Sequence, residues 1–451
     1  METTICAIAT ALGVGAISII RISGPQAISV VNSFFMGKDL TKVKSHTINY
    51  GHFIDENKKV IDEVLISVMK APRTFTKEDV VEINCHGGIA VTNKILEILL
   101  SSGCELAQPG EFTKRAYLNG RIDLVEAEAI SDMIYSQTEA ARALAIGQIT
   151  GGLSANINYI RNQLSDILAN IEVNIDYPEY NDIPVITTEK IRNQLKAIKV
   201  ELNQLLTDSQ NGRLIREGIT ITLIGKPNVG KSSLLNALIQ KEKAIVTDVA
   251  GTTRDLVEAS IVLSGIKINF IDTAGIRKTK DKIEQIGIEK SLKAIKEADM
   301  IILILNNNEK IEAEDQDLLN LIKQKNKIIF INKSDLEKKI ELSRAEGEYI
   351  FGNTIKDNGL NALKQKIIDT FNLGQINQQD PNYVSNIRQI SLIKLALKSI
   401  NNCLTEINDN LPIDMLTIEI KNAFDLLGEV IGKTYTEELL DKLFSKFCVG
   451  K

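Results

Sequence analysis

The chain has 451 residues, of which 44% are hydrophobic and 25% charged, a composition typical of soluble globular proteins and not of disordered or fibrous ones. This length predicts about three domains, each large enough to bury a core. The formal net charge of −5 excludes a generally basic surface, so any contact with RNA requires a local patch or a partner.

The chain contains five cysteines, which are Cys6, Cys85, Cys104, Cys403 and Cys448. Their odd number and their lack of Cys-x-x-Cys spacing favour reduced thiols in a cytoplasmic protein over a disulfide framework or a zinc site. The apolar run at 5–20 lacks the positive flank of a signal peptide, and Gly13 and Gly15 interrupt it. It predicts two short strands joined by a glycine turn. No stretch approaches membrane-spanning length, so no membrane association is expected.

Strands and helices are mixed up to about Gly120. Strand-like runs cover residues 4–9, 16–22, 47–54, 64–69 and 80–85, and helical spacing covers 25–35 and 89–100. His86 precedes Gly87 and Gly88 at a strand-to-helix corner, where a lone histidine is more often structural than catalytic. This part of the chain predicts an α+β domain.

Helical patterns follow from Leu124 onward. Apolar stripes run through 125–134, 153–171 and 191–205, with a break at Tyr177-Pro178. The polar segment 207–212 predicts a linker. Helical stripes return after Tyr383, at 390–404, 415–427 and 436–447. The region between 213 and 374 therefore reads as a domain inserted into a helical one.

The inserted region begins with a phosphate-binding signature. An apolar run at 219–224 precedes Gly225-Lys226-Pro227-Asn228-Val229-Gly230-Lys231-Ser232, and a helical pattern follows. Strand, glycine loop and helix are the context of a P-loop, whose backbone N–H groups and helix N-terminus bind phosphates. Lys231 is expected to reach the β- and γ-phosphates, and Ser232 to bind Mg²⁺. Further strands at 266–271, 300–305 and 327–331 predict a mostly parallel sheet covered by helices on both faces.

Two later motifs favour GTP over ATP as the nucleotide. Asp272-Thr273-Ala274-Gly275 follows a strand, where an NTPase needs an aspartate near Mg²⁺ and a glycine N–H near the γ-phosphate. Asn332-Lys333-Ser334-Asp335 follows another strand, and a carboxylate there can accept two hydrogen bonds from guanine but not from adenine. The segment 248–255 lies between the P-loop and the Asp272 motif and can supply a threonine hydroxyl to Mg²⁺, as switch loops do.

The position that orients water in Ras-type enzymes is not a glutamine in this chain. Ile276 occupies it, and an isoleucine cannot orient water. The chain is then either a slow switch or uses another group. Glu284 is a candidate carboxylate, although a solvated helix residue is the more common reading of such a position.

These motifs together resemble the MnmE (TrmE) family of tRNA modification GTPases. The resemblance rests on residues 225–233, 250–255, 272–277 and 448–451, and in the N-terminal half on 21–24, 75–76, 78–83, 86–88, 109–113, 115–116, 118–121 and 123–129. It covers essentially the whole chain in one order.

The resemblance implies an N-terminal α+β folate-binding and dimerisation domain (1–118), a discontinuous all-α domain (119–213 and 374–451) and an inserted Ras-like GTPase domain (214–373). It implies a potassium-activated GTPase in the cytoplasm. This GTPase would act as a homodimer that forms a heterotetramer with the FAD- and NADH-dependent MnmG protein. The assembly would use 5-formyl- or methylene-tetrahydrofolate to add an aminomethyl or carboxymethylaminomethyl group to C5 of the wobble uridine of certain tRNAs.

The resemblance also implies residue roles. It places the folate at Arg21, Glu82, Arg121 and Lys451, and K⁺ at Asn228, Thr247, Val249 and Thr252. Mg²⁺ would be held by Ser232 and Thr253. Glu284 would organise the hydrolytic water, and Cys448 is a candidate reactive thiol. The implied GTP-binding residues are Asn228, Val229, Gly230, Lys231, Ser232, Ser233, Thr247, Asp248, Val249, Ala250, Gly251, Thr252, Thr253, Asp272, Thr273, Ala274, Gly275, Asn332, Lys333 and Asp335.

The chain departs from the family pattern in several places. The loop 10–15 lacks the usual Pro-Pro and Arg, Asn84 stands where a histidine is common, and 177–180 is less acidic than usual. The usual base-supporting loop is not recognisable near 352–354. A different class of protein, a GTP-controlled interaction switch such as a ribosome-assembly GTPase, explains the nucleotide motifs equally well. It does not explain Arg21, Glu82 or the ending Cys448-Val449-Gly450-Lys451.

Overall fold

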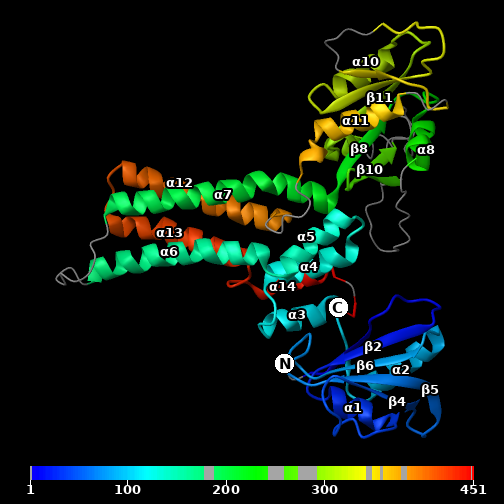
Figure 1. The fold of residues 1–451 in the computed structure, drawn as a ribbon, viewed down its shortest axis with the longest axis vertical. Helices are drawn as coiled ribbons and strands as arrows, with labels where there is room; N and C mark the ends of the chain where they lie inside the picture. The colour runs from blue at the N-terminus through cyan, green and yellow to red at the C-terminus, as the bar shows by residue number, and fades with distance from the viewer. Residues whose placement is uncertain are drawn as a thin grey trace, which may run out of the picture. The chain divides into compact units, whose positions relative to one another are not determined.

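The computed structural model describes residues 3–176, 187–241, 259–272, 292–341, 348–355, 359–376, 383–447 and 449–450. Contacts divide the chain into two compact units (Figure 1). The first unit comprises residues 1–131, 154–191 and 398–451, and the second comprises 132–153 and 192–397. None of the described helices is both long enough and apolar enough to cross a bilayer.

The first unit begins with a seven-stranded sheet in the order β3-β4-β5-β6-β2-β1-β7. Its strands are β1 Ile5–Ile8, β2 Ile17–Ser23, β3 Phe35–Met36, β4 Thr47–Ile54, β5 Val60–Met69, β6 Val80–His86 and β7 Glu105–Leu106. Neighbouring strands are antiparallel except for β1 and β7, which are parallel. The predicted pair of short strands joined by a glycine turn is confirmed as β1 and β2.

The two faces of this sheet are covered differently, because side chains alternate along a strand. Ile20 and Ile22 of β2 face α1 Ala27–Ser33 and α2 Ile89–Ser101, with which they form the main core of the domain. Ile5 and Ala7 of β1 pack instead with Phe112, which belongs to α3 Glu111–Leu118. Arg21 is the residue of β2 between Ile20 and Ile22 and therefore lies on the α3 side of the sheet.

Further helices precede and follow the second sheet along the chain. They are α4 Leu124–Tyr135, α5 Glu139–Ile149, α6 Gly152–Asp176, α7 Thr188–Glu217, α12 Ile387–Asn408, α13 Ile413–Val430 and α14 Glu437–Phe444. In the first unit, Arg161 of α6 donates through Nε to the Phe424 carbonyl of α13 at 3.2 Å, and its guanidinium lies over the Phe424 ring. These contacts show that apolar and polar groups together fix the packing of α6 on α13.

One sequence prediction is wrong here. The segment 207–212 is not a linker but part of α7, which continues without interruption to Glu217. Its polar residues do not interrupt the helix, because most are at least partly exposed. Gly212 passes so close to the second unit's Val384 that a Cβ would lie 2.5 Å from the Val384 carbonyl oxygen. Close packing therefore requires this glycine within the helix. The predicted break at Tyr177-Pro178 lies outside the described residues.

The second unit contains a six-stranded sheet in the order β13-β12-β11-β8-β10-β9. Its strands are β8 Ile219–Ile224, β9 Ala259–Leu263, β10 Ile266–Asp272, β11 Met300–Asn306, β12 Lys327–Asn332 and β13 Tyr349–Phe351. All neighbours are parallel except β9 and β10. The predicted mostly parallel sheet is confirmed.

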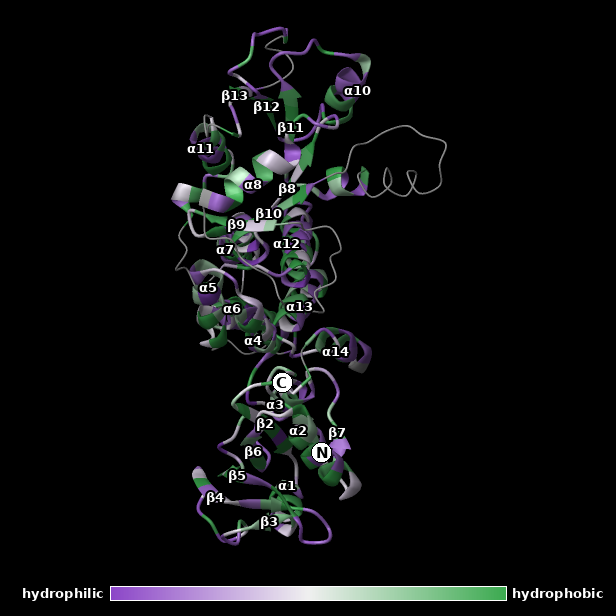
Figure 2. Ribbon diagram, turned by 90° about the vertical axis from the view of Figure 1, so that its right-hand side faces the viewer, coloured by the Kyte–Doolittle hydropathy of each residue, from purple (hydrophilic) through white to green (hydrophobic). Residues whose placement is uncertain are grey.

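Helices cover both faces of this sheet, as expected for parallel strands that are buried on both sides. One core joins β8 and β11 to α8 Lys231–Lys241 and α11 Leu360–Thr370. The other joins β11 and β12 to α10 Ala313–Leu321 and the helical residues 292–297. Every residue of β11 is buried, and Figure 2 shows this strand and β8 as largely hydrophobic. The carboxyl ends of β8, β10 and β12 carry the predicted nucleotide motifs.

Candidate functional site

The loop between β8 and α8 contains three residues with a positive φ, each of a type that adopts this backbone conformation readily. Gly225 and Gly230 have φ values of 151° and 100°, and Asn228 has a φ of 62°. Left-handed backbone favours glycine, and asparagine tolerates it better than most residues. A Cβ on Gly225 would lie 2.5 Å from the Ile304 carbonyl oxygen, and one on Gly230 would lie 2.3 Å from Nδ2 of Asn332. The glycines therefore bring the loop against β11 and β12.

Lys231 lies at the first position of α8 and is buried. Its Nζ donates to the carbonyl oxygens of Gly225 at 2.9 Å and Lys226 at 3.0 Å. Burial lowers the pKa of the ammonium group, and the Asp272 carboxylate opposes that shift. Because its hydrogen-bond partners are neutral carbonyls, the positive charge is directed into the loop and remains available to a phosphate.

A magnesium site fits the residues at the end of β10. Ser232 Oγ donates to Asp272 Oδ2 at 3.4 Å. The other carboxylate oxygen, Oδ1 of Asp272, is buried and has no hydrogen-bond partner among the described residues. Buried polar atoms without a partner are rare, and Mg²⁺ prefers oxygen ligands of these types beside substrate phosphates. Asp272 and Ser232 could therefore hold Mg²⁺ together or through its water ligands.

Asn332, at the end of β12, connects the base-reading motif to the P-loop. Its Nδ2 donates to the Val229 carbonyl at 2.8 Å, and its Oδ1 accepts from the Thr354 N–H at 3.3 Å. The Ser334 N–H donates to the Gly352 carbonyl at 3.0 Å. The segment 352–354 thus supports this motif mainly through its main chain, which explains why its side chains did not reveal it in the sequence. Asp335 follows Ser334 in the same turn.

Many predicted nucleotide residues cannot be placed. Those outside the described residues are Thr247, Asp248, Val249, Ala250, Gly251, Thr252, Thr253, Thr273, Ala274, Gly275, Ile276 and Glu284. The structure brings together Lys231, Ser232 and Asp272, and it links Asn332 to the P-loop. The predicted potassium set is represented only by Asn228, an exposed residue.

A second polar site lies on the N-terminal sheet. Arg21 of β2 and Glu82 of β6 are direct partners in the antiparallel register. The Arg21 Nε and Nη2 atoms donate to Glu82 Oε1 at 2.9 Å and 2.8 Å, and the guanidinium lies 5.8 Å from the Phe112 ring centroid. Both side chains are only about one-fifth exposed. They present adjacent donors and acceptors whose charges largely cancel.

The C-terminal tail contacts this pair at Gly450. Arg21 Nη1 donates to the Gly450 carbonyl at 3.2 Å. Gly450 has a φ of 92°, and a Cβ there would lie 2.5 Å from the Ile8 carbonyl oxygen of β1. The tail follows α14, whose Phe444 is buried with Tyr117 and Leu124. Residues more than 400 positions apart in the sequence therefore meet on one sheet face, although Cys448 and Lys451 themselves lie outside the described residues.

Arg121, the fourth predicted folate residue, stacks on an aromatic ring. Its guanidinium lies 4.9 Å from the Phe75 ring centroid. Phe75 packs against the cluster that contains Phe112, over which Arg21 lies. The structure therefore connects Arg121 to the Arg21–Glu82 pair through two aromatic side chains.

His86 makes a specific polar contact at the strand-to-helix corner. Its Nδ1 atom lies 2.7 Å from Asp62 Oδ1, and its backbone N–H donates to Asp62 Oδ2 at 2.8 Å. The hydrogen bond with Asp62 raises the pKa of the imidazole. The ring is 69% exposed, so the histidine is hydrogen-bonded to Asp62 of β5 but is not buried.

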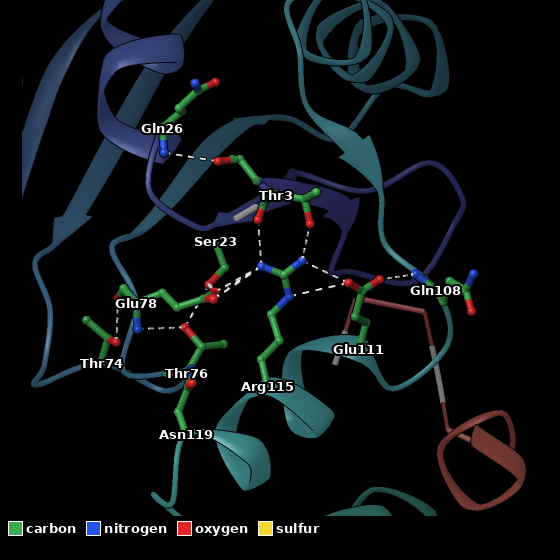
Figure 3. A network of polar contacts seen from close by, with 11 residues as sticks. Thr3, Ser23, Gln26, Thr74, Thr76, Glu78, Gln108, Glu111, Arg115 and Asn119 are labelled. Carbon is green, nitrogen blue, oxygen red and sulfur yellow. Dashed lines mark hydrogen bonds and ion pairs between the residues drawn. The ribbon is translucent and has the colours of Figure 1, made fainter. Parts of the chain in front are cut away.

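Sequence reasoning missed the role of Arg115. This residue is 1% exposed and donates to the Thr3 carbonyl, to Glu78 and to Glu111 (Figure 3). A buried guanidinium needs such compensation. Its pairing with Glu78 fixes the loop before β6. The sequence signals were the resemblance at 115–116 and a charged residue within a short, partly apolar helix, and neither indicates these partners.

Comparison with known proteins shows the family of this chain. Residues 4–121 match the family described as GTP-binding protein TrmE N-terminus, and residues 124–448 match the MnmE helical domain. The chain is 48% identical over 457 residues to the tRNA modification GTPase MnmE of Staphylococcus aureus strain Newman, covering 99% of both chains. The protein of the same name from strain JH9 matches equally.

This chain belongs to the MnmE family of tRNA modification GTPases. Solved structures with similarity include Era of Aquifex aeolicus, 26% identical with a TM-score of 0.27, over 40% of this chain and 66% of that one. The G domain of the Thermotoga maritima FeoB iron transporter is 27% identical with a TM-score of 0.27, over 35% of this chain and 99% of that one.

Membership of the MnmE family accounts for the nucleotide site in general terms. As a GTPase of this family, the chain binds GTP and Mg²⁺, for which the Lys231, Ser232 and Asp272 geometry is suited. As a tRNA modification enzyme it acts on tRNA. Because the family consists of tRNA modification GTPases, we reject the alternative of an interaction switch without modification chemistry.

Proposed function

We propose that this MnmE-family GTPase hydrolyses GTP with potassium activation and, together with the FAD-dependent MnmG protein, modifies C5 of the wobble uridine of certain tRNAs. In this proposal a tetrahydrofolate supplies the one-carbon unit for the aminomethyl or carboxymethylaminomethyl group. The protein acts as a homodimer in the cytoplasm. The free thiols at Cys6, Cys85, Cys104 and Cys403 are consistent with this reducing compartment.

The observation that carries the folate part of the proposal is the meeting of the tail with Arg21 and Glu82. The carbonyl of Gly450 accepts a hydrogen bond from Arg21, so the tail reaches the ion pair. A pterin ring offers adjacent N–H donors and acceptors on one edge, and a carboxylate beside a guanidinium offers the complementary set. Phe75, which lies below Arg121 and is partly exposed, supplies apolar area for the rest of a folate, and the buried Phe112 ring supports Arg21 from below.

Different residues of the chain bind the phosphates, the metal and the guanine base of GTP. Lys231 neutralises phosphate charge, Ser232 and Asp272 hold the metal, and Asp335 reads guanine. Asn228 has an exposed side chain in a left-handed backbone conformation, which offers an amide oxygen to a cation beside the phosphates. Potassium there supplies positive charge where the transition state becomes more negative, as an arginine finger does in other GTPases.

Salt exchange tests the potassium part. GTP hydrolysis should be much faster in KCl than in NaCl at equal ionic strength, and Asn228→Ala should remove most of that difference while GTP still binds. Equal rates of the unmodified protein in the two salts would overturn the potassium assignment.

Deletion of the tail tests the folate part. Removal of Cys448–Lys451 should abolish tRNA modification and weaken tetrahydrofolate binding measured by calorimetry. Potassium-stimulated GTP hydrolysis should persist, because the P-loop belongs to the other compact unit. Normal wobble-uridine modification by the truncated protein would contradict the role of the tail.

A further inference from the structure

The N-terminal domain contains an open cavity of about 420 Å³ that includes Arg121. Three of its lining residues are cations, namely Arg73, Lys77 and Arg121, and none is a carboxylate. Such an excess of one charge in a concave site concentrates the field and attracts anions. The cavity is notable in a chain whose net charge is −5.

The charges of these cations are not neutralised by the residues around them. Lys77 Nζ donates to two neutral carbonyl oxygens, those of Asn119 and Gly120, each at 3.0 Å. Arg121 stacks on Phe75, and an aromatic ring does not cancel a full charge. The Glu126 carboxylate interacts electrostatically with Arg121 but does not line the cavity. Arg73 is exposed and makes no ion pair with any described residue.

The backbone that carries these cations is fixed by buried polar groups (Figure 3). Thr76 Oγ1 lies 2.7 Å from Ser23 Oγ, and the Thr76 carbonyl accepts from Asn119 Nδ2 at 2.6 Å. Thr74 Oγ1 donates to the Glu78 carbonyl at 2.7 Å, and Arg115 binds the Glu78 side chain. Because the loop 73–78 is already ordered, a ligand would have to immobilise only the ends of Arg73 and Lys77.

The cavity shares Arg121 with the proposed folate site. Arg121 belongs to both, and Phe75 below it lines the cavity. Phe75 also packs in the cluster of Phe112, which lies below the Arg21 guanidinium. An elongated ligand with its ring system at Arg21 and Glu82 could therefore reach the three cations past Arg121 and the partly exposed Phe75.

We propose that this cavity binds the γ-linked glutamate tail of a polyglutamylated tetrahydrofolate. Each added glutamate contributes one carboxylate, and Arg73, Lys77 and Arg121 supply the matching cations. The inference rests on the folate site proposed above and adds the substrate form and two residues, Arg73 and Lys77. A tRNA backbone is the other polyanion that the family uses. Because Arg121 belongs to both the cavity and the proposed folate site, we favour the folate tail.

The experiment measures binding of 5-formyltetrahydrofolate in its mono- and triglutamyl forms to the full chain by calorimetry. The triglutamyl form should bind about tenfold more tightly at 50 mM salt, equivalent to one or two exposed charge-assisted contacts. The advantage should shrink to about twofold at 0.5 M salt, because exposed charges are screened.

Substitutions of Arg73 and Lys77 test whether these cations cause the preference for the triglutamyl form. Arg73→Gln should reduce the triglutamyl advantage to about threefold, and Arg73→Gln with Lys77→Gln should abolish it, since each removes a partner worth a fraction of a tenfold change. Both should leave monoglutamyl affinity within twofold. Lys77 also donates to the carbonyls of Asn119 and Gly120, so its substitution could disturb the structure around the cavity. The single Arg73 variant leaves these hydrogen bonds intact and therefore tests the charge alone. Lys38→Gln with Lys94→Gln is the matched control, because both lysines are exposed and outside the cavity.

The outcomes separate the two proposals. If neither form binds, the folate site and this inference are both wrong. If the two forms bind equally, only the inference is overturned. Filter binding of tRNA to the same variants gives the remaining result. A loss of tRNA affinity in the Arg73 and Lys77 variants, with an unchanged preference for the triglutamyl form, would assign the cavity to RNA instead.

Discussion

The two polar sites differ in whether a neighbouring carboxylate neutralises the charge of their central cation. Lys231 donates to two neutral carbonyls of its own loop, so its charge is held in place but not cancelled. Arg21 is paired with the Glu82 carboxylate, so its charge is cancelled and its hydrogen-bonding groups are held in place. The first arrangement suits a ligand with several negative charges, and the second suits a neutral heterocycle with donors and acceptors.

Lys77 extends this comparison within the N-terminal domain. Like Lys231, it donates to two main-chain carbonyls and forms no ion pair with a described residue. Unlike Lys231, it is exposed, so solvent and salt weaken its interaction with an anion. Similar hydrogen bonding at different burial therefore predicts tight phosphate binding in one place and a modest, salt-sensitive preference in the other.

The strongest test of the comparison removes the uncancelled charge. Lys231→Met should weaken GTP binding about a hundredfold or more, because the lost charge-assisted bonds to phosphates contribute about 3 kcal/mol. Titration with a fluorescent GTP analogue measures the change. Folate binding measured on the same variant should remain unchanged, and a loss of both would show that the variant is misfolded.

The second prediction concerns the base. Asp335→Asn replaces one acceptor oxygen by a donor amide, which should weaken GTP binding by about 2–3 kcal/mol and favour xanthine nucleotides. Competition between GTP and XTP measures the switch. Asp317, an exposed acidic residue on α10, offers Asp317→Asn as a control that should leave base preference unaltered.

The third prediction separates hydrolysis from binding. Glu284→Ala should bind GTP normally but hydrolyse it at least about tenfold more slowly, a barrier increase of about 1.4 kcal/mol. Single-turnover hydrolysis at saturating GTP measures the chemical step. A rate within twofold of the unmodified protein would return Glu284 to the role of a solvated helix residue.

The elements that sequence alone predicted well are those with a long, regular pattern. The bounds of β4 and β8 match the predicted strands at 47–54 and 219–224. The strands β3, β7 and β13 have only two or three residues, which is too short for periodicity to show. The false linker at 207–212 arose because polar residues on an exposed helix face resemble a loop in composition.

The sites show a similar limit. Motifs located Lys231, Asp272 and Asn332, because phosphate and guanine require fixed residue types at fixed places. The bond from Asn332 to the Val229 carbonyl and the contact of Gly450 with β1 join distant segments, and no local pattern encodes them. Arg73 and Lys77 belong to no motif, since any exposed cation serves a loosely held carboxylate.

The smallest expected effect comes from the tail. Gly450→Ala places a methyl group 2.5 Å from the Ile8 carbonyl oxygen at a φ of 92°, so the tail must move away from β1 and its carbonyl must leave Arg21. The Arg21–Glu82 pair remains, which limits the loss of tetrahydrofolate affinity to about fivefold, or about 1 kcal/mol. Val449→Ala is the matched control, because Val449 is 50% exposed and should tolerate the change. Calorimetry on both variants, with GTP hydrolysis as the readout of the other unit, decides the point. If Gly450→Ala binds tetrahydrofolate as the unmodified chain does, the contact of the tail with Arg21 is not part of the folate site, and Arg21 and Glu82 must act without it.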